Sequence, residues 1–366
     1  MNTKTAIVTT TINIPKFLED ICTNANKYKH RSIGIIVIGD KKTPAEIYNF
    51  CDELAKKYGY PVEYYDLNRQ EERLKNYPDL LSIIPYNSGA RKLLGNLIAY
   101  KDGYETIIQI DDDNFIGESD FISEHNNVNK TKNIKLFKSK NNWHNIYSDL
   151  IEENNIPFFP RGFPWGKRDY NLLSKAEVLN EEKKIVLING LVFEDPDIDA
   201  ISRLFWPIRV IGTKNNLNEN FGLYPGTWSS FNNQNTSTSR ELTSVYFTPV
   251  CVGRNSDIWT SFVMCKLTEV AGDVIAFGAP YVKQLRNEHD LWDDLKLELE
   301  NNILTDYFVN LLKNSKIKKN NYLAMLIDLI NNCINDVNLD KNLSNDDKNY
   351  IKQYFKEYKI WANCFK

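Results

Sequence analysis

Residues Tyr104 to Gly117 read YETIIQIDDDNFIG, and this stretch decides how the first part of the chain is interpreted. The mainly apolar run Ile107 to Ile110 is typical of a buried strand, yet it stops at three consecutive carboxylates, Asp111, Asp112 and Asp113. Like charges at this spacing repel one another, and burying a carboxylate without a partner is costly. We therefore expect a group that compensates these three aspartates.

Short β-branched runs alternate with amphipathic helical patterns before this stretch. Strands are expected over residues 5–14, 33–40 and 62–67, and helices over residues 15–28, 45–59 and 89–103. This alternation is the mark of βαβ units on a mostly parallel sheet. Because ligands bind beyond the carboxyl ends of strands in open α/β sheets, the aspartates lie where a ligand site is expected.

The second part of the chain repeats strand and helix signals after a Lys- and Asn-rich stretch, residues 126–143, which predicts a surface connection. Further strands are expected over residues 183–193, 243–253 and 272–282, and a helix over residues 256–272. The polar segment 217–241 predicts a mobile loop beside the site.

The fold class that follows is α/β, with a mixed, mostly parallel sheet flanked by helices and a helical C-terminal extension. We divide the chain into a first half, residues 1–125, a second half of the same domain, residues 126–301, and the extension, residues 302–366. The apolar stripe of the extension predicts core packing, not a cofactor site.

Bulk composition excludes several classes of protein. A net charge of −3 gives no long-range attraction to nucleic acid, so no nucleic-acid partner is expected. Six scattered cysteines and four histidines signal neither a zinc site nor a disulfide framework. The N-terminus is too polar for a signal peptide, and no run reaches the roughly 18 to 20 apolar residues of a membrane helix. We expect a cytoplasmic protein, and the sequence leaves open whether it forms a homo-oligomer.

The triple aspartate suits a hard divalent cation. Mg²⁺ and Mn²⁺ prefer oxygen ligands, and one or two carboxylates commonly hold them while substrate phosphates and water complete the shell. Residues i and i+2 at a strand end point the same way, so Asp111 and Asp113 are expected to address one ion, with Asp112 facing another neighbour. A solvated acidic turn is the alternative interpretation.

The neighbouring strand and helix ends suit a nucleoside diphosphate. Backbone N–H groups and two cationic side chains at the start of the helix before the aspartates suit a phosphate, through Asn87, Gly89, Arg91 and Lys92. Asp40, at the tip of the second strand, suits a ribose or base. Thr9 and Thr10, at the end of the first strand, are assigned to the same nucleotide site. The alternatives are a solvated helix face and a turn-forming aspartate.

Five motifs then resemble a known family in their order along the chain. They are QIDDDNFIG (109–117), RGFPWGKR (161–168), INGLVFEDPDIDAISRL (188–204), NSDIWTSFVMCKLTEVAG (255–272) and APYVKQLRN (279–287). Together they resemble the motifs of the reversibly glycosylated polypeptides, which act as UDP-arabinopyranose mutases, and of the related STELLO-type glycosyltransferases. The resemblance covers roughly residues 5 to 300.

The resemblance implies a GT-A fold, a nucleotide-diphospho-sugar site and a divalent metal held by Asp111 and Asp113, with Asp112 beside them. It makes residues 1–125 the nucleotide-sugar-binding half and residues 126–301 the acceptor or catalytic half. Arg161 and Arg168 match the two arginines of the mutases' RGYPFSLR pattern, of which the first is reported to carry the sugar. A guanidinium stays protonated and is a poor nucleophile, so a clamp on pyrophosphate or on an acidic acceptor is chemically easier to defend.

Asp257 is the candidate catalytic base. The pattern places it at the N-cap of a helix, and capping alone would account for it. In inverting GT-A enzymes an acidic residue at a helix start in this region deprotonates the acceptor hydroxyl, and the resemblance gives Asp257 that role.

Two departures from the mutase pattern bear on function. The mutases' YDDMW is NSDIW here, which places Ser256 where they have an acid, and Gln284 aligns with the histidine that follows their PYIW. Arg286, Asn287 or His289 would then take over that histidine's role. The VKQLRNEHDLWDDL form is closer to the STELLO-type proteins.

The sequence therefore predicts a metal-dependent glycosyltransferase that passes a sugar from a nucleoside-diphosphate donor, with UDP as the expected nucleotide, to a hydroxyl of a carbohydrate or glycan acceptor. The cofactor expected is Mn²⁺ or Mg²⁺. The alternative is a pyranose/furanose mutase acting through Arg161, and the third hypothesis is a non-catalytic binding protein that retains the fold.

Overall fold

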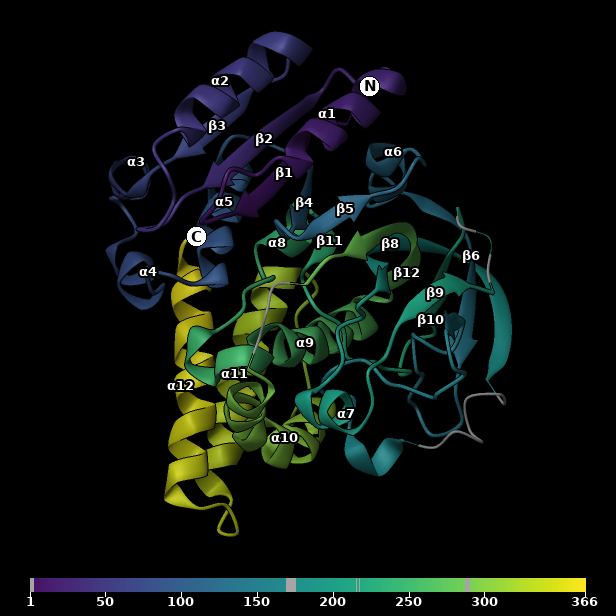
Figure 1. Ribbon diagram of the computed structural model, residues 1–366. Helices are drawn as coiled ribbons and strands as arrows, with labels where there is room; N and C mark the ends of the chain where they lie inside the picture. The colour runs from purple at the N-terminus through teal and green to yellow at the C-terminus, as the bar shows by residue number, and fades with distance from the viewer. Residues whose placement is uncertain (1–2, 169–175, 215, 217, 287–289) are drawn as a thin grey trace.

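One mixed sheet forms the centre of the molecule, with helices packed on it (Figure 1). The computed structural model describes residues 3–168, 176–214, 216, 218–286 and 290–366. Among these residues the sheet has twelve strands in the order β3-β2-β1-β4-β11-β8-β6-β10-β12-β5, with β9 on β8 and β7 on β9. The strands are β1 Thr5–Thr10, β2 Ile33–Ile38, β3 Val62–Tyr65, β4 Thr106–Ile110, β5 Asn114–Ile116, β6 Thr131–Lys138, β7 Leu150–Glu152, β8 Glu177–Glu194, β9 Val210–Thr213, β10 Asn220–Leu223, β11 Asn235–Ser239 and β12 Val274–Gln284.

The helices confirm the α/β class and the helical C-terminal part. They are α1 Phe17–Lys27, α2 Ile47–Tyr58, α3 Leu67–Arg73, α4 Pro78–Ile83, α5 Lys92–Lys101, α6 Phe121–His125, α7 Ala200–Phe205, α8 Arg240–Thr243, α9 Ser256–Ala271, α10 Leu291–Asn314, α11 Tyr322–Leu339 and α12 Asn345–Asn363. In the described residues no helix combines the length and the apolar character needed to cross a membrane.

Strands β1 to β4 form the expected parallel unit, with β1 between β2 and β4 and with β3 beyond β2. Successive residues of β1 point to opposite faces, so Ala6 and Val8 join the core under α5, whereas Ile7 joins the core under α1 and α2. The carboxyl ends of β1, β2 and β4 therefore meet at one edge of the sheet, and the aspartates follow β4 at that edge (Figure 1).

Strand β11 corrects the prediction of a mobile loop over residues 217–241. It lies in the middle of the sheet, antiparallel to both β4 and β8, and its five residues, NTSTS, are buried. The buried side chains find partners inside the protein: Asn235 donates to the Pro280 carbonyl at 2.8 Å, and Ser237 contacts His125 at 2.9 Å. A polar composition concealed a core strand because its hydrogen bonds are satisfied internally.

Three other expectations about the second half also differ from the structure. Residues 126–143 contain β6, in which Ile134 and Leu136 are buried, so the stretch is not only a surface connection. Residues 243–253 form no strand; Phe247 packs against Trp361 of α12 with ring centroids 5.2 Å apart. The helical part begins at Leu291, so the expected boundary at residue 302 falls inside α10. The division into two halves stays a prediction.

The C-terminal helices pack on the rest of the molecule, as the apolar stripe predicted. Trp259 of α9 stacks on Phe308 of α10 with centroids 4.0 Å apart, and Tyr354 of α12 meets both rings edge-on. At the end of the chain Lys101 donates to the Cys364 carbonyl at 2.7 Å. The extension thereby supports both α9 and the N-terminal half.

We predict that Gly95→Ala destabilises the protein, because α5 lies too close to β1 and β2 for a side chain. A Cβ atom at Gly95 would lie 2.5 Å from a Val8 methyl carbon and 3.0 Å from Ile38 Cγ1. Overpacking of this kind costs about 1 to 3 kcal/mol, against about 1 kcal/mol gained from helix propensity. Urea unfolding should show a net loss, with Gly166→Ala, where a Cβ meets nothing closer than 3.9 Å, as the near-neutral control. A stabilised Gly95→Ala protein would contradict this packing.

Candidate functional site

Polar groups at the carboxyl ends of β1, β2 and β4 form one hydrogen-bonded network. Thr11 donates its hydroxyl to Asp112 Oδ2 at 2.7 Å, and the Thr43 hydroxyl donates to the Thr11 carbonyl at 2.7 Å. Asp40 donates its N–H to Thr43 Oγ1 at 2.8 Å and accepts from the Ser88 N–H at 3.2 Å. Sequence reasoning missed Thr11, Thr43 and Ser88, although each lies within three residues of a predicted site residue.

The predicted threonines, Thr9 and Thr10, lie at the end of β1, but their hydroxyl groups donate to backbone carbonyls and not to the aspartates. Thr10 donates its hydroxyl to the Ile38 carbonyl of β2 at 2.9 Å, and Thr9 is buried in the sheet. In this arrangement both support the edge, and Thr11 is the threonine that reaches the aspartates.

The predicted phosphate-binding segment precedes α5. Asn87 has a left-handed backbone (φ 52°), and the 3-10 turn Gly89–Arg91 is capped by Ser88. Arg91 and Lys92 are 3% and 2% exposed, so they do not form a solvated helix face. Arg91 donates to Gln70 and lies 4.0 Å from Asp40, and burial lowers the pKa of its guanidinium.

Lys92 supplies part of the compensation that the aspartates require. Its ammonium group pairs with Asp111 Oδ1 and donates to the Asn233 carbonyl at 3.1 Å. The pair neutralises one of the three carboxylates, so Lys92 binds the protein's own acid in this arrangement.

The aspartates themselves form a turn, which overturns the strand-alternation argument for pairing Asp111 with Asp113. Strand β4 ends at Ile110, and the Asn114 N–H donates to the Asp111 carbonyl at 3.2 Å. Asp111 therefore meets Lys92, whereas Asp113 Oδ2 accepts from Gln284 Nε2 at 2.9 Å.

Asp112 and Asp113 line the same small cavity, of about 160 Å³, with residues Asn13, Ile14, Pro15, Phe115 and Leu285. Burial raises the pKa of Asp113 to about 6; the hydrogen bond from Gln284 opposes this, and the neighbouring Asp111 and Asp112 add to it. Burial also raises the pKa of Asp112. Two crowded carboxylates on one cavity fit a hard divalent cation whose remaining ligands come from a substrate. Among the described residues no three His, Cys, Asp or Glu side chains are grouped as a complete metal site.

Arg161 is the centre of a second cluster, which is buried. Its Nε donates to both oxygens of Asp197, at 2.9 and 3.1 Å, and its Nη2 donates to both oxygens of Asp257, at 3.1 and 3.0 Å. Its Nη1 donates to Asn255 Oδ1 at 3.2 Å and to the Arg254 carbonyl. Burial opposes the charge, but Asp197 and Asp257 raise the pKa of Arg161 well above its ordinary value.

The two carboxylates of this cluster differ from one another. Burial acts to raise the pKa of Asp197, but Arg161 lowers it to about 2. For Asp257 burial prevails over Arg161, and the pKa is raised. The N-cap prediction for Asp257 is wrong: Asn255 occupies the N-cap, and Asp257, the second residue of α9, accepts from the adjacent Ile258 N–H at 3.0 Å.

Arg168 and Arg286 lie in ion pairs near this cluster. Arg168 donates to Asp199 at 2.6 Å, where Asp199 caps α7, and its guanidinium lies 3.6 Å from the centroid of Trp165. Arg286 lies 3.5 Å from Asp294, and burial lowers the pKa of Arg286. Asn287 and His289 lie outside the described residues.

A chain of side-chain amides joins the aspartate turn to the Arg161 cluster. From Asp113 the chain passes to Gln284, and Gln284 Oε1 accepts from Gln234 Nε2 at 3.1 Å. Asn232 then donates to Gln234 Oε1 at 3.0 Å and to Asp197 Oδ2 at 3.0 Å. The structure thus brings together residues predicted from both halves, through two amides, Asn232 and Gln234, that sequence reasoning placed in a loop.

Comparison with known proteins leaves the family of this chain open. No family model matches it, and no curated protein matches it. Among solved structures it is similar to residues 1–349 of S. aureus TarS, with a TM-score of 0.36 and 11% identity over 99% of this chain and 91% of that one. A similarity this low carries no argument about function, which has to come from the site.

We predict that Arg161→Met strongly destabilises the protein, because it leaves Asp197 and Asp257 buried without their cation. Breaking a buried pair in this way costs about 3 to 5 kcal/mol in the free energy of unfolding. The matched control is Arg209→Met, since Arg209 also bridges two carboxylates, Glu153 and Glu194, but is 54% exposed. That change should cost at most about 1 kcal/mol. Equal losses for the two variants in urea unfolding would contradict this account of Arg161.

Proposed function

We propose that the protein is a glycosyltransferase that uses a nucleoside-diphosphate sugar, with UDP as the expected nucleotide. The observation that supports this most is the continuous hydrogen-bonded path from Asp113 to Arg161, which runs in order through Gln284, Gln234, Asn232 and Asp197. The path connects carboxylates that suit the cation and diphosphate of a donor with a charged cluster that suits an acceptor. The resemblance of the five sequence motifs points to the same activity.

The donor is assigned to the edge formed by β1, β2 and β4. Asp40 and the segment Asn87 to Lys92 would receive the nucleoside and phosphates, and Asp112 and Asp113 would hold a divalent cation, with Asp111 beside them. The cation, when bound, supplies positive charge that stabilises the leaving diphosphate. Gln284 orients Asp113 through the amide hydrogen bond, and Lys92 holds Asp111 in place through their ion pair.

Asp257 remains our candidate base, and its contacts set a condition on that role. Both carboxylate oxygens are held by Arg161, so an acceptor hydroxyl has to displace the guanidinium from at least one of them before proton transfer. Burial, which raises the pKa of Asp257, favours proton uptake once that oxygen is released. Arg161 would then stabilise negative charge near the reacting groups, with Arg168 and Arg286 as further cations of the site.

The mutase alternative needs Arg161 to attack a sugar as a neutral nucleophile. Each of its three nitrogens donates to the protein, and two carboxylates raise its pKa well above the ordinary value, which is unfavourable for nucleophilic attack. The third hypothesis, a binding protein without catalysis, predicts donor binding without turnover.

We predict that Asp113→Asn stabilises the protein but weakens its binding of UDP with Mn²⁺. In the wild type the raised pKa of Asp113 means that the folded state binds a proton more tightly than the unfolded state does. As the pH rises from about 4 to about 6, Asp113 loses this proton and the free energy of unfolding of the wild type falls. The variant has no titrating group at this position, so its stability does not fall in this way. At pH 7 the variant should therefore be more stable by about 1 to 2 kcal/mol, after allowance for partial exposure.

Two measurements check this prediction. Urea unfolding across that pH range gives the stability difference, and calorimetric titration with UDP, with and without Mn²⁺, should show a loss of at least about tenfold in affinity for the Mn²⁺-dependent step. Asp52→Asn, on the exposed face of α2, is the control. Unchanged Mn²⁺-dependent binding in Asp113→Asn would remove the metal assignment.

We predict that the protein with Mn²⁺ and a panel of UDP-sugars binds one donor and hydrolyses it slowly to UDP and free sugar, without isomerising the ring. Asp257→Asn should retain donor affinity and lose turnover by about a hundredfold or more, as expected for removal of a general base. NMR of the sugar products and mass spectrometry of the protein check this. A ring-isomerised nucleotide sugar, or a sugar adduct on the peptide containing Arg161, would favour the mutase instead. Binding without any product would favour the third hypothesis.

A further inference from the structure

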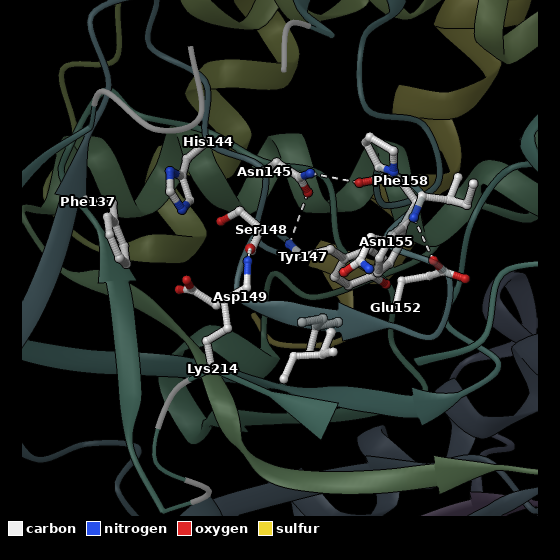
Figure 2. Close-up of a pocket in the computed structure, with 14 residues that line it drawn as sticks. Phe137, His144, Asn145, Tyr147, Ser148, Asp149, Glu152, Asn155, Phe158 and Lys214 are labelled. Atoms are coloured by element: carbon white, nitrogen blue, oxygen red, sulfur yellow. Dashed lines mark hydrogen bonds between the residues drawn. The ribbon is translucent and has the colours of Figure 1, made fainter. Parts of the chain in front are cut away.

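A separate cavity of about 480 Å³ lies beside the Arg161 cluster, between the end of β6 and the segment that contains β7 (Figure 2). Its walls are aromatic at two places: Phe137 and His144 on one side, and Tyr147 and Phe158, with ring centroids 5.4 Å apart, on the other. Its size and its mixture of apolar walls with a few polar groups are those of a small-molecule site. The proposed donor site uses none of these residues.

His144 is the most informative residue of this cavity. Its side chain is 2% exposed and stacks on Phe137 with centroids 4.5 Å apart and an interplanar angle of 13°. Within the described part of the chain neither ring nitrogen has a hydrogen-bond partner. Figure 2 shows the ring on the cavity wall above Asp149 and beside Ser148. Burial lowers the pKa of His144 to about 4, so the neutral ring presents one N–H donor and one acceptor nitrogen.

The charges around the cavity argue against an anionic ligand. Among the described residues that line it, Lys214 is the one cation, and its ammonium group donates to the Ser148 carbonyl at 3.2 Å. Asp149 and Glu152 lie on the same lining, and Glu152 Oε2 already accepts the backbone N–H groups of residues 154 and 156. A phosphate would meet more negative than positive charge, whereas a neutral ligand would not.

We propose that this cavity binds a neutral saccharide unit, with His144 donating one hydrogen bond to a sugar hydroxyl and accepting one from another. Hydroxyl groups both donate and accept, which matches a neutral imidazole, and the C–H faces of a sugar ring suit the aromatic walls. The identification of this unit as part of the acceptor rests on the proposed glycosyltransferase function; binding of the saccharide itself does not.

The cavity and the Arg161 cluster share a backbone support. Tyr147, on the cavity wall, donates its hydroxyl to the Asp197 carbonyl at 3.3 Å, and the Arg161 N–H donates to the same carbonyl at 2.9 Å. Phe158 precedes Arg161 on the same loop, and its carbonyl accepts from Asn145 at 2.8 Å. A saccharide in the cavity would thus contact the elements that hold the proposed catalytic cluster, as one end of an extended acceptor would.

The test is titration of the full chain, without UDP or metal, with the methyl glycosides of glucose, galactose, xylose and N-acetylglucosamine up to about 20 mM, followed by ligand-observed NMR. We expect at least one glycoside to bind, and His144→Phe, which retains the stacking ring but lacks both nitrogens, to weaken it by about tenfold or more. The matched control is His30→Phe, because His30 lies in the N-terminal half and pairs with Asp120; it should leave saccharide affinity unchanged.

A second readout uses the wild type alone, so the proposal remains testable if the variant fails to fold. The chain has four histidines, and in protein labelled with ¹⁵N-histidine the glycoside should shift the ring-nitrogen signals of His144. No binding by any of the glycosides, unshifted His144 signals, or equal affinity in His144→Phe and His30→Phe would overturn the proposal. A UDP titration of the same samples tests the donor site separately, so failure of one proposal is distinguishable from failure of the other.

Discussion

The buried ion pairs of Arg161 are the interaction on which the second half of the structure depends. One guanidinium holds Asp197, which follows β8, and Asp257, in the first turn of α9, while its own backbone lies on the loop after residue 158. Three segments far apart in the sequence are thus fixed by one side chain. A buried pair of this kind is a weak source of net stability, but losing its cation is expensive. Arg161 therefore determines the arrangement of these segments more than it determines their stability.

The same physical problem, buried charge, is solved differently at the aspartate turn. Lys92 neutralises Asp111, whereas Asp112 and Asp113 are held by neutral donors, Thr11 and Gln284. A hydroxyl or an amide orients a carboxylate without cancelling its charge. Burial raises the pKa values of both acids, although these two hydrogen bonds oppose the rise. Negative charge is consequently concentrated on the small cavity that the two side chains line, which is the electrostatic condition for attracting a cation.

The parallel unit could be predicted from sequence because each signal there is local. The β-branched runs of β1 and β2, and Gly59 with its left-handed backbone at the end of α2, can each be recognised without knowledge of the rest of the chain. Strand β11 could not be recognised in this way. Its side chains are Asn, Ser and Thr, and they fit the core only because distant residues such as Asn189 and His125 supply their hydrogen bonds. The order of polar and apolar residues in a segment does not indicate which distant residues will supply its hydrogen bonds.

The candidate site shows the same limit at the level of single residues. Charged residues identified from motifs, such as Asp113 and Arg161, are joined by hydrogen bonds through other side chains. Two of those side chains, Asn232 and Gln234, belong to no motif. Amide side chains carry both a donor and an acceptor, so a series of them can connect carboxylates of opposite halves without adding charge. In a site where negative charge has to be held at fixed positions, neutral connectors keep the local field unchanged while they restrict motion. That requirement favours Asn232 and Gln234 just before β11 and Gln284 at the end of β12, where an apolar residue would break the path and a charged one would alter the pKa values of the carboxylates at both ends.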